Sequence, residues 1–190
     1  LVIARVSDTY GFTFIHNDGL LNDKVVAFAA AEDQAFCIFQ SRVHEAWARV
    51  FSSTLKDDLQ YTPSGCTDTF CLPTNWSSNA TLGSTGRWYF DLRAACMKVE
   101  GIGLTDFYNR FHDPNETSPD IFRLRELHAA MDRAVLDAYD WQDIQPVCGF
   151  GLDYLELDDD AQVSPEAQKV IDQGNLWFPT AEQAQAFARG

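Results

Sequence analysis

The stretch DQAFCIFQSRVHEAWARVF, residues 33–51, decides how this chain folds. Its large apolar side chains recur at intervals of three and four, at Phe36, Phe39, Val43, Trp47 and Val50. This spacing places them along one face of an α-helix, so it predicts a helix from about residue 33 to residue 51 with that face against a core. Arg42, Glu45 and Arg49 fall off the stripe, and we expect them to meet solvent or a partner.

Residues before this helix are typical of short strands. Residues 1–15 and 24–28 are rich in β-branched and aromatic side chains, and turn residues separate them at Asp8, Gly11 and 16–19. Short connections favour antiparallel pairing, so we expect a small meander. The opening letters, LVIAR, resemble the middle of a strand, and we suspect a piece of a longer protein.

Residues after the helix are first polar and then helical again. Residues 52–73 are expected to be an irregular loop, and the small polar residues 74–86 a flexible linker. A helical stripe follows at Trp88, Leu92, Ala95/Cys96 and Val99, and TDFYNRF (105–111) predicts a short helix. Ser118, Pro119 and Asp120 are a strong helix start. From there a stripe runs to about residue 139, through Ile121, Leu124, Leu127/His128, Met131, Val135 and Ala138/Tyr139.

Together these patterns predict an α+β fold. A small, mainly antiparallel sheet packs on the helix that contains Trp47, and an antiparallel helical hairpin follows. We divide the chain into an α/β unit at 1–73, a linker at 74–86, the hairpin at 87–145 and an acidic segment at 146–190.

The charge of the chain excludes one broad class of function. Fourteen basic and twenty-eight acidic residues leave a net charge of −14, and two basic and nine acidic residues in 141–190 account for half of it. A domain that holds nucleic acid by bulk charge is usually basic, so tight autonomous binding is not expected. No apolar run reaches the length of a membrane span. The five cysteines form no Cys-x-x-Cys, which favours free thiols in the cytoplasm.

A search for catalytic chemistry finds no convincing centre. The chain has no His-Glu-x-x-His, no phosphate loop and no Gly-x-Ser-x-Gly elbow. His128 lies on an apolar stripe and is expected to be a partly buried histidine with satisfied hydrogen bonds. The acidic pair 57–58 and the acidic run 158–160 are expected to be solvated rather than bound to a cation.

Three stretches resemble one known group of proteins. They are SRVHEAWARVFSSTLKDDLQYTPSGCTDTFCLP (41–73), GIGLTDFYNRFHDP (101–114) and PDIFRLRELHAAMDRAVLDAYDWQDI (119–144). In this order they resemble the target-recognition region of type IIG and IIL (MmeI-like) restriction–modification enzymes and of BREX-type adenine DNA methyltransferases. The resemblance covers roughly residues 10–145. Cys71-Leu72-Pro73 departs from the proline motif of the group, and the tail 146–190 matches only loosely.

The resemblance implies that residues 52–73 are a DNA-recognition loop. Lys56 and Asp58 match positions that face base edges, since lysine can donate to guanine and aspartate can accept from the cytosine amino group. Gln60 stands where the group often has arginine, and it suits adenine or a phosphate. The resemblance further implies backbone or stacking contacts from a second set: Arg49, Ser52, Ser53, Thr54 and Tyr61.

The function that follows is DNA sequence recognition without catalysis. The chain lacks the Asn-Pro-Pro-Tyr hallmark and a nuclease cluster, so we expect no enzyme here and no cofactor. S-adenosylmethionine and Mg would belong to the parent enzymes. The expected partners are double-stranded DNA, bound weakly by the chain alone, and an upstream methyltransferase domain or subunit. The alternatives are a non-catalytic protein-interaction or scaffold domain that has lost DNA reading, and, ranked last, a stand-alone hydrolase.

Overall fold

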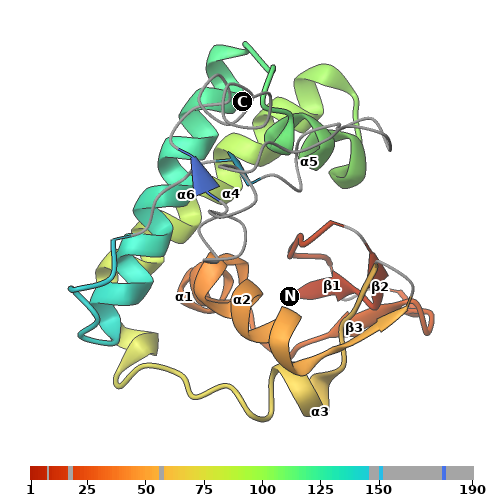
Figure 1. The fold of residues 1–190 in the computed structure, drawn as a ribbon. Helices are drawn as coiled ribbons and strands as arrows, with labels where there is room; N and C mark the ends of the chain where they lie inside the picture. Colours follow the sequence, from red (N-terminus) through yellow and green to blue (C-terminus); the bar gives the residue numbers. More distant parts are fainter. Residues whose placement is uncertain (8, 17–18, 56–57, 146–149, 152–176, 179–190) are drawn as a thin grey trace, which may run out of the picture.

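A computed structural model describes residues 1–7, 9–16, 19–55, 58–145, 150–151 and 177–178. Short antiparallel strands lie on one side of the molecule, two long helices on the other, and helices α1 and α2 between them (Figure 1). This arrangement confirms the α+β class, with a small sheet region packed on helices and an antiparallel helix pair after it. None of the described helices is long and apolar enough to span a membrane.

The strands form two small antiparallel sheets before the helix pair. β1 (Val2–Ala4) pairs with β3 (Val25–Ala27) in the first sheet. In the second sheet β5 (Asp58–Gln60) lies between β2 (Val6–Ser7) and β4 (Ser53–Leu55). The strand expected over 24–28 is therefore confirmed as β3. Near the end of the chain β6 (Phe150–Gly151) pairs with β7 (Trp177–Phe178).

The predicted helix 33–51 is wrong in one respect, because it is two helices. α1 spans Asp33–Gln40 and α2 spans Arg42–Phe51, and Ser41 between them is extended at φ −67° and ψ 155°. The Ser41 hydroxyl accepts a hydrogen bond from the His44 N–H and so caps α2. This break turns a different face inward. His44 and Ala48 are buried in α2, whereas Val50 from the expected stripe is exposed.

The segments expected to be irregular have regular structure. Residues 52–73 hold the β4–β5 pair and the short helix α3 (Pro63–Cys66). The stretch 74–86 begins with a short 3-10 helix, η1 (Trp76–Ser78), and is α-helical from Ala80 onward. A flexible linker is therefore the wrong description of residues 80–86: Asn79 caps this helix by accepting from two backbone N–H groups, and its first turns are buried against α1.

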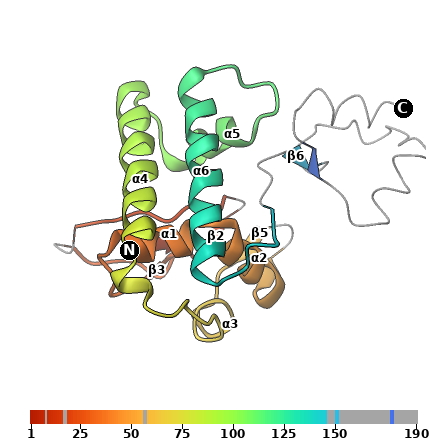
Figure 2. The same cartoon turned by 90° about the vertical axis from the view of Figure 1, so that its left-hand side faces the viewer.

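The helix pair is α4 (Ala80–Glu100) and α6 (Pro119–Ala138), joined through α5 (Leu104–His112). Figure 2 shows α4 and α6 side by side and antiparallel. The stripe predicted for α6 is confirmed, with its central side chains buried at Ile121, Leu124, His128, Met131 and Val135.

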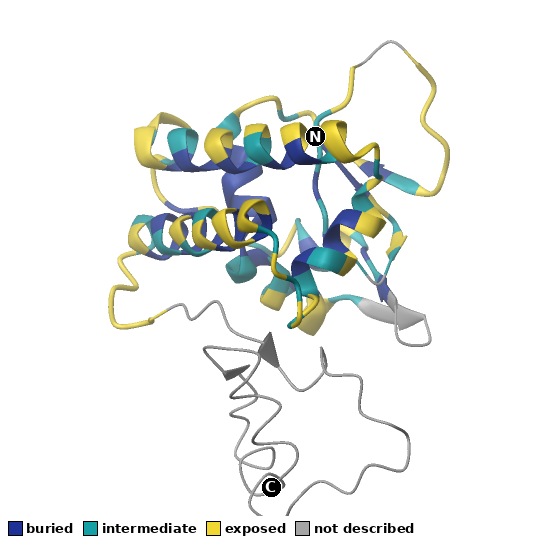
Figure 3. Cartoon of the chain, turned by 90° about the horizontal axis from the view of Figure 1, so that it is seen from above, coloured by how far each residue is buried: buried dark blue, intermediate teal, exposed yellow. Residues whose placement is uncertain are grey.

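The stripe predicted for α4 is right in its middle, where Leu92 packs against the core and Cys96 is buried, and wrong at its two ends. Trp88 and Val99 are exposed, and the buried face instead comprises Leu82, Thr85, Gly86, Tyr89, Arg93 and Cys96. Figure 3 shows the buried faces of the helices turned toward one another and toward the strands. One core cluster contains residues of the strands, of α1 and α2 and of the helix pair. The core therefore continues across the boundary that we placed at 74–86.

Four described cysteines are free thiols: Cys37, Cys66 and Cys96 are buried, and Cys71 is exposed. Cys148 lies outside the described residues, as does nearly all of the acidic segment 146–190. The expectation of free thiols therefore stands for the four cysteines that the structure describes.

Candidate nucleic-acid interface

The segment that resembles a recognition loop folds as a β-hairpin. In β4 and β5, Ser53 faces Gln60 and Leu55 faces Asp58. The second edge of β5 pairs with β2, where Val6 faces Gln60. β5 is thus held on both sides, which fixes the register of the hairpin against the sheet.

For several of the residues that we predicted to contact DNA, the structure does not describe the side chain. Lys56 is outside the described residues. The backbone of Asp58 lies in β5, and the backbones of Ser53 and Thr54 lie in β4. The side chains of these three residues are outside the description. The structure therefore brings these three into one hairpin without testing what their side chains contact. Their roles remain predictions.

The base of the hairpin is anchored in the core. Leu59 is buried and Gln60 is half-buried, and Tyr61 is completely inaccessible to solvent. Alternate residues of a strand point to opposite faces, so burial of Leu59 and Tyr61 turns Gln60 to the other face. The expected DNA contact of Tyr61 is therefore wrong, because its ring and hydroxyl are enclosed. Tyr61 supports the hairpin instead of touching a ligand.

The Tyr61 hydroxyl belongs to a buried chain of hydrogen bonds. Its oxygen lies 3.1 Å from His44 Nε2 and 2.8 Å from Thr67 Oγ1. On the other side of the imidazole ring, Nδ1 lies 3.2 Å from the Tyr10 hydroxyl, which donates to the Phe39 carbonyl at 3.0 Å. These contacts connect the strand β5, the helices α1 and α2, and the N-terminal segment.

The donor and acceptor roles in this series of hydrogen bonds follow from the groups at its two ends. Tyr10 uses its only proton on the Phe39 carbonyl, so it must accept from His44 Nδ1–H. A neutral His44 with its proton on Nδ1 then accepts at Nε2 from Tyr61, which in turn accepts from Thr67. Burial lowers the pKa of His44 to about 3 and raises the pKa of Tyr61, so both groups are neutral at ordinary pH.

Two arginines of α2, Arg42 and Arg49, are already paired with carboxylates. Arg49, predicted to contact DNA, donates from Nε and Nη2 to Glu45 Oε1 at 2.9 and 2.7 Å. Arg42 lies with Nε 3.9 Å from Asp132 Oδ2. The positive charge of these two arginines is therefore largely compensated within the protein.

Ser52 marks the junction between α2 and the hairpin. It is half-buried, and its Oγ has no hydrogen-bond partner among the described residues. Its backbone N–H donates to the Ala48 carbonyl and closes α2. The described residues contain no group of three or more metal-type ligands, so this interface offers no metal site there.

Sequence reasoning missed the residues that hold the hairpin in place. His44 carries no motif, and Thr67 lies in a turn after α3. Only the fold brings residues 10, 44, 61 and 67 together. The one available indication was that His44 follows Ser41 by three residues, which is the spacing of a helix cap.

Comparison with known proteins gives one match. Residues 7–74 match the family model described as MmeI, target recognition domain. The searches of curated proteins and of solved structures found no match. The matched segment begins at β2 and ends after α3, so it contains the whole hairpin and the buried chain beneath it. The predicted resemblance to an MmeI-like target-recognition region is thereby confirmed for residues 7–74, roughly a third of the chain.

Proposed function

We propose that this chain is a DNA sequence-recognition module of a restriction–modification system, in which the β4–β5 hairpin reads base edges. The observation that supports this proposal is the match of residues 7–74 to a target recognition domain. A two-stranded ribbon fits the major groove of B-form DNA, which is roughly 12 Å wide. In this proposal Lys56 and Asp58 supply base contacts, Gln60 contacts an adenine or a phosphate, and Ser52, Ser53 and Thr54 contact the backbone.

A target recognition domain is a non-catalytic part of its enzyme, so chemistry on the DNA would come from elsewhere. We infer that an adenine-N6 methyltransferase domain or subunit is the partner, and that S-adenosylmethionine and Mg belong to the parent enzymes and not to this chain. The module would then act in the cytoplasm, where restriction–modification enzymes meet DNA. The buried chain through His44 would hold the hairpin rigid before DNA binds, which reduces the entropic cost of recognition.

The test is selection from a randomised duplex library by the full chain, followed by anisotropy titration of the selected duplex. A base-specific contact contributes about 1–3 kcal/mol of discrimination. Lys56→Ala and Asp58→Ala should each relax the preference at one base pair by that amount. Lys98→Ala and Asp106→Ala, exposed matched controls on α4 and α5, should leave the preference intact. Unchanged preferences in both hairpin variants would contradict base reading by this hairpin.

Affinity for DNA by the chain alone should be weak. With a net charge of −14, the chain has little long-range attraction for phosphates, and a gel shift at low salt should require micromolar protein or more. Submicromolar binding by the isolated chain would contradict this expectation. It would also remove the need for a basic clamp from a partner domain.

A second candidate function, protein association, is favoured by a strip of aromatic side chains that is exposed at its two ends. Ring contacts connect Phe51, Trp47, Phe70, Tyr139 and Trp141, with centroid separations of 4.2 to 6.3 Å. Phe51 and Trp141 are 49% and 44% exposed, so they leave apolar surface in contact with water. Exposed apolar surface of this kind marks sites of protein association. Light scattering that shows a stable oligomer, together with no DNA selection, would favour this role over DNA reading.

A further inference from the structure

Most cations of the described chain are neutralised by the protein itself. Two arginines, Arg93 and Arg125, are buried. Carboxylate oxygens lie within 4.0 Å of six others: Arg42, Arg49, Arg87, Arg110, Arg123 and Arg133. Among the described residues, Arg5, Lys24 and Lys98 alone are neither buried nor ion-paired with a described carboxylate.

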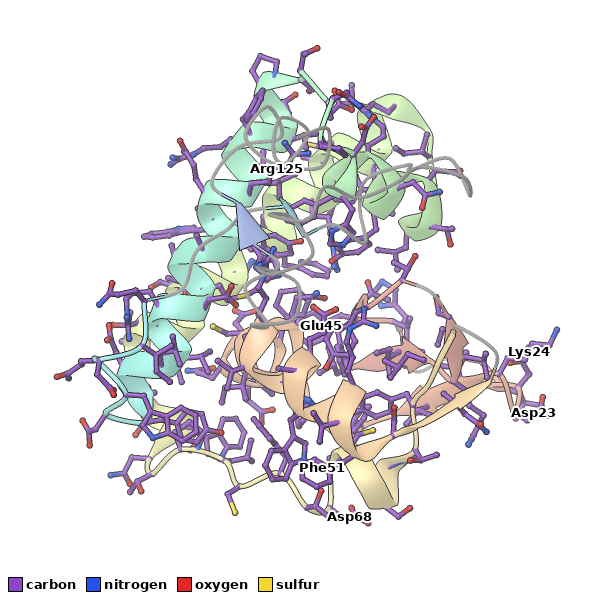
Figure 4. All side chains as sticks on the ribbon, viewed as in Figure 1. Asp23, Lys24, Glu45, Phe51, Asp68 and Arg125 are labelled. Carbon is purple, nitrogen blue, oxygen red and sulfur yellow. The ribbon has the colours of Figure 1, made fainter. Side chains whose placement is uncertain are left out.

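Two of these three cations lie together beside the hairpin. The Arg5 N–H donates to the Lys24 carbonyl at 2.8 Å, and the Arg5 carbonyl accepts from the Tyr61 N–H at 2.8 Å. Arg5 therefore connects the start of β3 to the end of β5. Lys24 is exposed and points away from the body of the molecule at the edge of the strands (Figure 4).

The Arg5 side chain is held in place without losing its charge. Its Nε donates to the Asp23 main-chain carbonyl at 2.6 Å, and the described residues offer its two terminal nitrogens no acceptor. Asn22 Oδ1 accepts from the Lys24 N–H and tightens the same turn. The Asp23 carboxylate belongs to this turn as well, so Arg5, Asp23 and Lys24 together carry one net positive charge on a strongly acidic chain.

The spacing along the hairpin fits a groove-binding arrangement. Arg5 lies opposite residue 61, three residues from Asp58 at the start of β5, and a strand advances about 3.3 Å per residue. The Arg5 backbone therefore lies about 10 Å back from the start of β5. The major groove is roughly 8.5 Å deep, so a hairpin that enters it leaves groups at this setback near the phosphates along the groove edge.

We propose that Arg5 and Lys24 form a phosphate-binding pair that positions DNA backbone against the base of the β4–β5 hairpin. The inference rests on the proposed function. It adds contacts that fix the orientation of the protein on the duplex and carry no sequence information. A guanidinium clamped through Nε presents its remaining N–H groups in a fixed fork, which suits a phosphate oxygen pair. Lys24 adds a point charge on the same side.

The experiment measures the salt dependence of DNA binding by the full chain. Anisotropy titrations of the selected duplex between about 50 and 200 mM KCl yield the slope of log K against log salt. Each lost phosphate contact reduces the magnitude of this slope by about 0.9. Lys24→Ala and Arg5→Gln should each lower the slope by that amount and weaken all duplex sequences equally. Lys98→Ala, on the last turns of α4 and far from the hairpin, should change neither quantity.

The outcomes separate the inference from the proposed function. Unchanged slopes in both variants, with normal binding by the parent chain, would overturn the phosphate pair and leave DNA reading intact. Absence of duplex binding by the parent chain would overturn both proposals. If Arg5→Gln fails to fold, Lys24→Ala decides alone, because the Lys24 side chain is exposed and its truncation should leave the fold intact.

Discussion

At the scale of single residues, buried polar side chains hold this fold together. Arg93 is 2% exposed and has no carboxylate partner among the described residues. It donates to the Tyr108 hydroxyl at 2.7 Å and to the Phe12 carbonyl at 2.6 Å, and it lies over the ring of Phe36. These contacts join α4 to α5, to α1 and to the N-terminal segment. Hydrogen bonds and ring faces thus compensate the desolvation of its charge.

Tyr61→Phe should destabilise the chain by about 1–3 kcal/mol. The change deletes one hydroxyl and leaves His44 Nε2 as a buried acceptor without a donor. Urea unfolding followed by circular dichroism measures the loss. Tyr139→Phe is the matched control, since its hydroxyl donates to the Cys71 carbonyl at the surface, and it should cost less. Equal losses in the two variants would argue against a stabilising role for the buried hydrogen bonds of Tyr61.

Stability should fall as the pH drops below about 6.5, the usual pKa of an unfolded histidine. Burial lowers the pKa of His44 to about 3, so between these values the unfolded chain binds a proton that the folded chain excludes. This single group contributes a slope of up to about 1.4 kcal/mol per pH unit, with stability present above pH 6.5 and lost on acidification.

The measurement is urea unfolding at several pH values from 7 to 5, compared with His44→Gln, which removes this titration. The variant should show a shallower pH dependence. NMR adds a check that needs no variant: the His44 ring signals should stay constant over this range in the folded chain. A ring signal that titrates near pH 6.5 in the folded state would contradict a neutral, buried His44.

At the scale of elements, the contact between α1 and α4 depends on one glycine. A Cβ at Gly86 would overlap the Asp33 carbonyl and come within 2.9 Å of the Cys37 Cβ. Gly83, one turn earlier on the same helix, faces only the flexible Gln34 side chain, at 3.1 Å. The two glycines therefore have opposite roles in one helix.

Gly86→Ala should destabilise the chain by about 1–3 kcal/mol, because overpacking separates α1 from α4. Gly83→Ala should be neutral or stabilising by up to about 1 kcal/mol, since alanine favours the helix. Thermal and urea unfolding compare the pair directly. A stabilising Gly86→Ala would show that the two helices are not in close contact at this position.

At the scale of the whole molecule, the recognition segment does not have a core of its own. Phe36 stacks with Tyr89 of α4 at 6.3 Å between ring centroids, and one cluster unites the strands with α4, α5 and α6. The hairpin that we propose to read DNA is therefore braced by the helix pair as well as by α2. A change in the helix pair can reach the interface through this core.

Residues 1–73 alone should not fold, because removal of α4 and α6 exposes much of the shared core. Residues 1–145 contain all of the described core and should unfold cooperatively. Circular dichroism and proton NMR of the two pieces test this. A cooperatively folded 1–73 would restore the domain boundary that the sequence suggested at 74–86.

Local pattern alone determined much of the architecture. Local sequence accounts for the stripe of α6, the strand β3 and the helical nature of 33–51. The start of α6 follows from the proline and the acidic residue of its first turn, Pro119 and Asp120. The likeness of residues 41–73 to a target-recognition region was also readable in the sequence, and the match over 7–74 agrees with it.

Tertiary structure decided which faces are buried and what holds the hairpin. Periodicity counts apolar residues, so it chose Trp88 and Val99 for the inner face of α4 and could not choose Arg93, whose partners come from residues 12, 40 and 108. The sequence predicted that Tyr61 is a surface aromatic. In the folded chain its hydroxyl is instead buried and bonded to His44 and Thr67. A buried polar group is stable only when distant residues satisfy it, and only the folded chain shows which residues those are.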